Sequence, residues 1–224
     1  LLSMEEVLTL FHEFGHALHG LFSNQRYPSL SGTTVARDFV ELPSLFNEYW
    51  ALDPKVFANY ARHYLTGATI PPALAAKVRE TTTFNQGYAM TEILAAATLD
   101  LQWHSLSESP ESVDIDEFER RALQEAQLNL AAIPPRYHSA YFLHIWANGY
   151  DAGYYAYLWA EMLARDAFAW FEEHGGLTRE NGQRFKERIL SRGNTWDLEE
   201  MFRDFRGRDP VIGPMLEFRG LKAH

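Results

Sequence analysis

The pair of histidines at His12 and His16 constrains the fold of this chain more than any other feature. Both lie in a stretch predicted to be helical over residues 4–22, because Ser3 and Glu6 form a capping-box signature ahead of it. A separation of four residues places the two imidazoles on one helical face, one turn apart, where they can share a tetrahedral ion. The fold must therefore bring a further ligand to this face from another segment.

The same stretch has an apolar period and an acidic residue beside the first histidine. Its apolar residues recur at helical spacing and predict one broad face in the core: Val7, Leu10, Phe11, Phe14, Leu18 and Leu21. Glu13 can reach a metal-bound water and act as its general base. Two histidine nitrogens, one carboxylate oxygen and a water in the fourth position suit zinc. The predicted cofactor is therefore one Zn²⁺ per chain.

The third ligand has three candidate sources. His19 lies three residues after His16. The extended metzincin pattern needs a glycine where His19 stands and a histidine where Phe22 stands, so the chain departs from it. Glu41 lies in a second predicted helix, over residues 38–52, which a short loop could return beside the first. We favour Glu41, and the alternative is a carboxylate that only stabilises the start of its helix.

Glu48 follows Glu41 at i+7, on the same face of the second predicted helix. A histidine that binds a metal usually donates its other ring N–H to a neighbouring acceptor. Glu48 is the candidate for that acceptor. The alternative is an ordinary solvated carboxylate.

Most of the remaining chain is predicted to be helical. The expected helices span residues 54–66, 72–83, 87–106, 114–130, 149–171, 178–191 and 196–206. The tail from Asp209 onward contains Pro210, Gly213 and Pro214 and is predicted to be extended. The fold class is therefore mainly α, a zincin-type helical domain with at most a small β element. No clear linker divides residues 1–224.

Composition excludes several classes of function. The formal net charge of −10 argues against binding nucleic acid, which needs a basic surface. The absence of cysteine excludes disulfides and thiol catalysis, so a transition metal must rely on histidines and carboxylates. No stretch reaches the ~18 apolar residues of a membrane-spanning helix, so no membrane partner is expected. Cytoplasm is the expected compartment, and the periplasm is also compatible. The start at Leu1, without Met, indicates a fragment.

A second candidate region carries a histidine and three tyrosines. Tyr150, Tyr154 and Tyr157 stand at i, i+4 and i+7 in the helix predicted over residues 149–171, so one face would present three phenols. Phenols and His144 could stabilise the negative charge that builds on a carbonyl oxygen during peptide hydrolysis. A tyrosine-rich core face is the alternative. Arg136 could bind the terminal carboxylate of a peptide, or be an ordinary surface arginine.

Three blocks of sequence carry a family resemblance. Residues 12–20 read HEFGHALHG, residues 31–50 read SGTTVARDFVELPSLFNEYW, and residues 141–159 read YFLHIWANGYDAGYYAYLW. Together they resemble the thimet-oligopeptidase-like family of zinc metallopeptidases, and most of all its bacterial peptidyl-dipeptidases. The resemblance covers essentially the whole chain, including SRGN and PMLEFRGL near its end.

The resemblance implies roles for particular residues. Glu41, in the DFVE segment, would be the third zinc ligand. His144, Tyr150 and Tyr157, with Tyr154 beside them, would contact the substrate and the tetrahedral intermediate. The histidines read as non-ligands are His19, His63, His104, His138, His174 and His224.

The resemblance also implies an activity. The expected reaction is hydrolysis of short peptides with release of C-terminal dipeptides, in which a zinc-bound water attacks and Glu13 is the general base. The alternatives are an endo-acting oligopeptidase of the same family and an inactive zinc-binding fragment. Members of the family are longer, and their substrate channel runs between two helical halves. Residues 1–224 are thus expected to be the C-terminal part of the catalytic domain, and the N-terminal part of the same enzyme to complete the channel.

Overall fold

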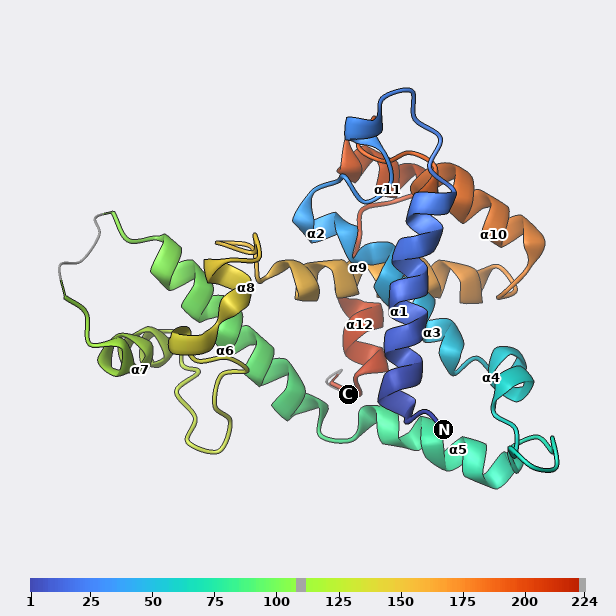
Figure 1. Ribbon diagram of the computed structural model, residues 1–224, viewed down its shortest axis with the longest axis horizontal. Coiled ribbons are helices and arrows are strands. Elements are labelled where there is room, and N and C mark those ends of the chain that lie inside the picture. Colours follow the sequence, from blue (N-terminus) through green and yellow to red (C-terminus); the bar gives the residue numbers. More distant parts are fainter. Residues whose placement is uncertain (108–111, 222–224) are drawn as a thin grey trace. The chain divides into compact units, whose positions relative to one another are not determined.

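The computed structural model describes residues 1–107 and 112–221, and the chain divides into two compact units. The first unit comprises Leu1–Phe84 and Trp159–His224, and the second comprises Asn85–Leu158. The described residues form helices and turns, with no strand and only two isolated bridges, Arg62 to Thr69 and Leu130 to Ile133 (Figure 1). The predicted mainly α class is therefore confirmed. No helix in the described part of the chain has the length and apolarity needed to cross a membrane.

The first unit contains most of the helices. Its elements before the second unit are α1 (Met4–Leu21), η1 (Pro28–Leu30), α2 (Arg37–Val40), α3 (Leu42–Ala51), α4 (Pro54–Tyr60), α5 (Pro72–Glu80) and η2 (Thr81–Thr83). After it come α9 (Ala156–Glu173), which begins three residues before the unit boundary, α10 (Arg179–Phe185), η4 (Lys186–Leu190), α11 (Leu198–Arg206) and α12 (Gly213–Phe218). The tail predicted to be extended therefore contains a helix, which Pro214 can enter because proline fits the first turn.

The core of the first unit fixes α3 against the C-terminal helices. Phe46 of α3 stacks on Phe185 of α10, with ring centroids 4.2 Å apart and planes within 24°, and packs against Phe171 of α9 at 5.0 Å. Both aromatic partners are buried in the same cluster, with Met201, Phe202 and Phe205 of α11. Each buried aromatic side chain removes a large apolar area from water, so this cluster anchors α3 firmly.

The second unit is built around α6 (Gln86–His104). The other elements are α7 (Ile115–Glu125), η3 (Ser139–Tyr141) and α8 (Leu143–Trp146). A row of small side chains on α6 allows α7 to pack closely, because Ala95 and Leu99 share a buried cluster with Ala122 and Leu123 of α7. On the other side, Phe142 and Ile145 pack on Ala96 and Ala97.

The helix predicted over residues 38–52 is two helices in the structure. α2 ends at Val40 and α3 begins at Leu42, so Glu41 occupies the junction. The physical cause is Pro43, which lies in the first turn of α3, where its missing N–H is not needed. Glu41 therefore lies beside the break and not within a continuous helix.

The predicted apolar core face of α1 is only partly buried. Leu10, Phe14 and Leu21 are 58%, 54% and 74% exposed, and Phe11 is the member of the stripe that packs against the core. Because residues 12 and 16 point toward α3, residues 10 and 14 lie about 200° around the helix, on its opposite side. The prediction of one broad buried face was wrong for these three residues.

Gly15 allows the backbones of α1 and α3 to approach closely. A Cβ at this position would lie 2.5 Å from Cα of Ser44 and 2.6 Å from the carbonyl oxygen of Pro43. The approach is reinforced by Asn47, whose Nδ2 donates to the carbonyl oxygen of Phe11 at 2.6 Å. A side chain larger than hydrogen would overlap backbone atoms, which cannot rotate away. Gly15 is thus needed to seat α3 against the histidine face of α1.

Replacing Gly15 tests this close approach. Alanine normally stabilises a helix interior relative to glycine, but Gly15→Ala should lower the free energy of unfolding by about 1–3 kcal/mol, the usual cost of overpacking. Gly20→Ala on the same helix is the matched control, because nothing lies within 4 Å of the added Cβ. Urea denaturation of both variants would measure the effect. A Gly15→Ala chain as stable as Gly20→Ala would contradict the packing argument.

Candidate active site

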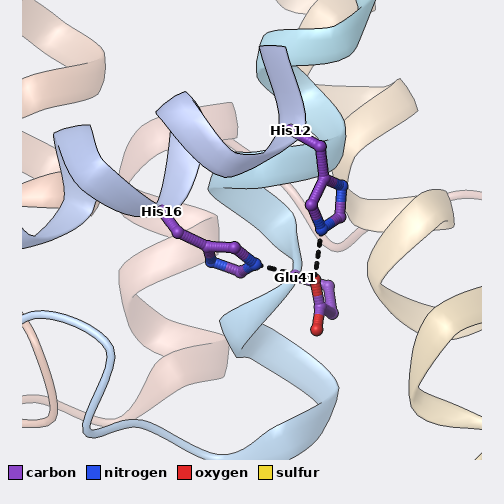
Figure 2. A group of neighbouring side chains, drawn as sticks. All are labelled: His12, His16 and Glu41. Carbon is purple, nitrogen blue, oxygen red and sulfur yellow. Dashed lines mark ion pairs between the residues drawn. The ribbon is translucent and has the colours of Figure 1, made fainter. Parts of the chain in front are cut away.

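His12, His16 and Glu41 lie together in the first unit, and each offers one atom that could hold a metal ion (Figure 2). We call these three residues the candidate metal-binding group. Oε2 of Glu41 lies 3.3 Å from Nε2 of His12 and 3.2 Å from Nε2 of His16. A tetrahedral zinc with bonds of about 2.0–2.1 Å holds its ligand atoms about 3.3 Å apart. Both separations from Glu41 therefore match this value, and all three donor atoms lie within 4.8 Å of one another.

The carboxylate of Glu41 is buried, and Ser44 in the first turn of α3 orients it. Oγ of Ser44 donates to Oε2 of Glu41 at 3.0 Å and to the backbone oxygen of Glu41 at 2.9 Å. Ser44 is itself fully buried, beside Gly15 of α1. The junction between α2 and α3 thus directs the Glu41 side chain toward the two histidines.

Glu48 lies on the far side of His12. Its Oε1 is 2.6 Å from Nδ1 of His12, so the hydrogen bond leaves Nε2 facing Glu41. Burial alone would lower the pKa of His12, but the hydrogen bonds to Glu41 and Glu48 outweigh it and raise the pKa to about 9. In the metal-free chain His12 therefore holds a proton at neutral pH.

His19 and Glu13 take different positions on α1. His19 is fully buried outside the group of three, and burial, together with the charge of His16, lowers its pKa to about 4. Glu13, next to His12 in the chain, has an exposed side chain. Of the two, only Glu13 is open to solvent and to a substrate.

His144 and the three tyrosines gather in the second unit. The His144 ring lies 6.1, 5.5 and 6.5 Å from the rings of Tyr150, Tyr154 and Tyr157, measured between centroids. Tyr150 stacks on Tyr157 at 5.1 Å, and Tyr154 meets Tyr157 edge-on at 5.3 Å. We call these four residues the aromatic cluster.

The backbone that presents the aromatic cluster differs from the prediction. Residues 149–155 form turns, and α9 begins only at Ala156, so Tyr150 and Tyr154 are not on a helical face with Tyr157. Gly149 and Ala152 adopt positive φ values of 74° and 54°, which interrupt any helix. The grouping of the three tyrosines therefore comes from a folded turn and not from helical period.

The protonation states of the aromatic cluster suit hydrogen-bond donation. Burial, followed by the charge of Arg136, lowers the pKa of His144, so its imidazole is neutral at pH 7. Burial raises the pKa of the Tyr154 phenol, which keeps its O–H proton in place.

Arg136 is half-exposed beside this cluster. Its Nη1 donates to Oε1 of Glu92 at 3.1 Å, and its backbone N–H donates to the carbonyl oxygen of Glu92. Tyr137 is a second hydrogen-bond partner of this guanidinium, which has five N–H donors in all.

Four of the other histidines make contacts with neighbouring groups, and these contacts account for their positions without a metal ion. His104 contacts Asp100, His138 contacts Glu119, and His174 stacks on Trp170. His63 accepts backbone N–H groups of its own turn. His224 lies outside the described residues.

The structure also shows contacts that the sequence interpretation missed. Tyr137 packs on His144 at 5.0 Å and on Tyr154 at 6.0 Å. Asp100 is fully buried on α6 and binds the turn that carries the tyrosines. A signal for Asp100 was present, because one acidic residue interrupts the otherwise apolar run ILAAATLDL.

Comparison with known proteins gives consistent matches. The chain is 59% identical over 221 residues to dipeptidyl carboxypeptidase from Escherichia coli, a match that covers 99% of the chain and 32% of that relative. It is 39% identical to oligopeptidase A from the same organism, over 100% of the chain and 33% of the relative. Saccharolysin from Saccharomyces cerevisiae is 31% identical over 99% of the chain and 31% of its own length.

The chain thus spans about a third of the length of these curated relatives. Its similarity to them extends from end to end, and the family model described as Peptidase family M3 matches residues 1–221. With the candidate metal-binding group on α1 and the α2–α3 junction, these matches identify the chain as a member of peptidase family M3.

Proposed function

We propose that the chain is the zinc-binding part of a metallopeptidase that hydrolyses short peptides, with His12, His16 and Glu41 as the three ligands of one Zn²⁺. The observation that carries this proposal is the separation of 3.2–3.3 Å between the Glu41 oxygen and the two Nε2 atoms. Two nitrogens and one oxygen leave a fourth tetrahedral position for a reactant, as in catalytic rather than structural sites. Bound zinc would supply Lewis-acid activation of water and of the scissile carbonyl.

Glu13 is the proposed general base. It follows His12 directly on α1 and is exposed, so its carboxylate can take a proton from a water molecule that enters beside the histidines. It then passes that proton to the amine that leaves when the peptide bond breaks. Glu48 holds His12 through Nδ1, which keeps the other ring nitrogen directed at Glu41.

The aromatic cluster is the proposed source of oxyanion stabilisation. His144, Tyr150 and Tyr157 would donate to the oxygen that becomes negative in the tetrahedral intermediate, with Tyr154 as a further substrate contact. The neutral imidazole of His144 has one N–H to donate. Arg136, which is half-exposed beside this cluster, is the proposed cation for a peptide's terminal carboxylate.

The remainder of a longer enzyme is the proposed partner of this chain. Two observations support it: relatives are about three times as long, and Leu10, Phe14 and Leu21 expose an apolar stripe on α1. An exposed contiguous apolar surface is typical of an interface. We propose that the chain is the C-terminal part of the catalytic domain, that the N-terminal part completes the substrate channel, and that the enzyme works in the cytoplasm.

Release of C-terminal dipeptides is the proposed specificity, since the relative with 59% identity is named a dipeptidyl carboxypeptidase. Endo-acting cleavage is the second candidate, because oligopeptidase A is 39% identical over the same chain. The metal chemistry is common to both, so the difference must lie in how the substrate's end is bound.

Zinc binding should displace a proton from His12. The ligand must be neutral at Nε2, whereas the pKa of about 9 leaves His12 protonated at pH 7.5 in the metal-free chain. In the metal-free chain, the stabilisation by this proton is fully present below about pH 6.5 and is lost as the pH rises through about 9. We therefore expect release of about one proton per zinc at pH 7.5, and an affinity that rises toward pH 9.

Calorimetric titration with zinc in buffers of different ionisation enthalpy would count that proton. Glu48→Gln should release less, because one of the two carboxylates that raise the pKa of His12 is neutralised, and should weaken zinc binding by about 10–100-fold. A binding enthalpy independent of the buffer would refute the proposed protonation state.

Glu13→Gln should retain zinc and lose activity. Removing a general base typically costs about 10²–10⁴-fold in rate, while the three ligand atoms stay in place. The measurement compares metal content of the chain with peptide turnover by a chimera, in which this sequence replaces the matching third of the E. coli dipeptidyl carboxypeptidase. Glu5→Gln, which changes an exposed carboxylate on the same helix, is the control and should keep both properties. An active Glu13→Gln chimera would exclude Glu13 as the base.

Peptides amidated at the C-terminus should distinguish the two specificities. If the enzyme binds a free terminal carboxylate, amidation removes a charge-assisted interaction and should lower kcat/KM by about 10–100-fold. Mass spectrometry of products from matched acid and amide peptides, with the chimera as enzyme, measures both rate and cleavage position. Equal cleavage of the two peptides would establish endo-acting cleavage instead.

A further inference from the structure

A buried carboxylate binds the turn that carries the tyrosines. Asp100 belongs to α6 and is fully buried. Its Oδ1 accepts the backbone N–H of Ala152 at 2.9 Å, and its Oδ2 accepts the backbone N–H of Tyr154 at 2.8 Å. Nδ1 of His104, one turn later on α6, lies 2.8 Å from Oδ1 and 2.9 Å from the backbone oxygen of Asp100. Both oxygens are therefore engaged with groups of opposite partial charge.

The turn needs such an anchor because its backbone is unfavourable by itself. Ala152 has φ 54°, a left-handed conformation that a residue with a Cβ rarely adopts. Gly149 also has a positive φ of 74°, and two internal bonds, from Gly153 N–H to the oxygen of Tyr150 and from Tyr150 N–H to that of His144, close the turn. A strained residue persists when its surroundings hold it in place. Asp100 holds Ala152 directly.

The anchored residues are those that carry the aromatic cluster. Tyr154 is itself one of the two donors to Asp100, and Tyr150 stands two residues before the other. The rings of Tyr150 and Tyr154 both meet Tyr157, the first tyrosine of α9. A shift of the turn would therefore move two phenols relative to His144 and Tyr157.

We propose that Asp100 is a positioning residue, which sets the turn at residues 149–154 so that the phenols of Tyr150 and Tyr154 are aligned for the reaction. The proposal rests on the function proposed above for the aromatic cluster. Asp100 acts through the backbone and does not touch the substrate. Preorganised donors accelerate a reaction because they are already in position when the charge develops.

The shape of the site shows why a carboxylate is required there. Each of the two oxygens of Asp100 accepts one backbone N–H, from Ala152 and from Tyr154, so both oxygens must be acceptors. Asparagine has the same shape, but one of its oxygens is replaced by an NH₂ that can only donate. Asp100→Asn therefore leaves one of the two N–H groups facing another donor.

Glu119 provides a matched control within the same unit. It is also buried, on α7, and it accepts from the backbone N–H of Ser139 and from Nδ1 of His138 at 2.7 Å. Glu119→Gln thus removes a comparable carboxylate from a comparable setting. It leaves the bonds of Ala152 and Tyr154 in place.

Hydrogen exchange on this chain tests the anchoring without any assay of activity. In the unaltered chain the amides of Ala152 and Tyr154 should be protected, although neither lies in a helix. Asp100→Asn should speed exchange of one or both by at least about tenfold, since the bond to a buried acceptor is lost. Glu119→Gln should not change them. Unprotected amides in the unaltered chain would overturn the proposal even if Asp100→Asn does not fold.

Kinetics in the chimera tests the alignment of the phenols. Asp100→Asn should lower kcat by about a hundredfold, the cost of a misplacement near 1 Å, with little change in KM. It should weaken a peptide phosphonate, which mimics the tetrahedral intermediate, by the same factor. A variant that only loses folded protein would bind fewer equivalents of phosphonate with unchanged affinity, and Glu119→Gln is expected to show at most that.

The outcomes separate the two proposals. Fast exchange at Ala152 or Tyr154 with normal turnover and normal phosphonate affinity in Asp100→Asn would overturn the positioning role. A parent chimera that binds zinc but hydrolyses no peptide would instead overturn the proposed function. Loss of turnover and of phosphonate affinity together, with Glu119→Gln unaffected, is the result expected.

Discussion

The contact between the backbones of α1 and α3 at Gly15 is the constraint on which the candidate metal-binding group depends. Without a side chain at this position, α3 can lie directly against the helical face that carries His12 and His16. Glu41, at the start of α3, then comes within 3.3 Å of both Nε2 atoms. The two histidines are four residues apart on one helix. Glu41 lies beside them because the backbones of α1 and α3 approach each other closely at Gly15.

Both units contain buried carboxylates, and these carboxylates have different partners in the two units. In the first unit, Glu41 and Glu48 lie beside His12 and raise its pKa to about 9, so a proton on this histidine offsets their charge. In the second unit, the two carboxylate oxygens of Asp100 accept the backbone N–H groups of Ala152 and Tyr154. A buried carboxylate is costly unless it is paired or hydrogen-bonded. Carboxylates paired with a histidine can respond to protonation, whereas a carboxylate bonded to backbone N–H groups fixes the geometry of a turn.

Much of the candidate site could be predicted from sequence, since the relevant patterns are short-range. Spacing on one helix predicted that His12 and His16 face the same way, whereas the break beside Glu41 was missed, because a single helix was predicted over residues 38–52. What could not be predicted depends on tertiary contacts. The tyrosines at residues 150, 154 and 157 have the spacing of a helix, but residues 149–155 form turns. There the N–H groups of Ala152 and Tyr154 donate to Asp100, about fifty residues earlier in the chain. The apolar stripe of α1 likewise predicted a buried face. The spacing of apolar residues shows that one face of a helix is apolar, but it does not show which segment, if any, covers that face.

The stacking of Phe46 on Phe185 has a consequence for how this segment can tolerate change. His12, His16 and Glu41 all lie within the first 41 positions, but the helix that begins beside Glu41 packs against aromatic rings from residues more than a hundred positions later. The position of Glu41 at the start of α3 therefore depends on packing against the chain's C-terminal helices. Substitutions there would alter how Glu41 is held relative to His12 and His16, although they leave the motif at His12 to His16 intact.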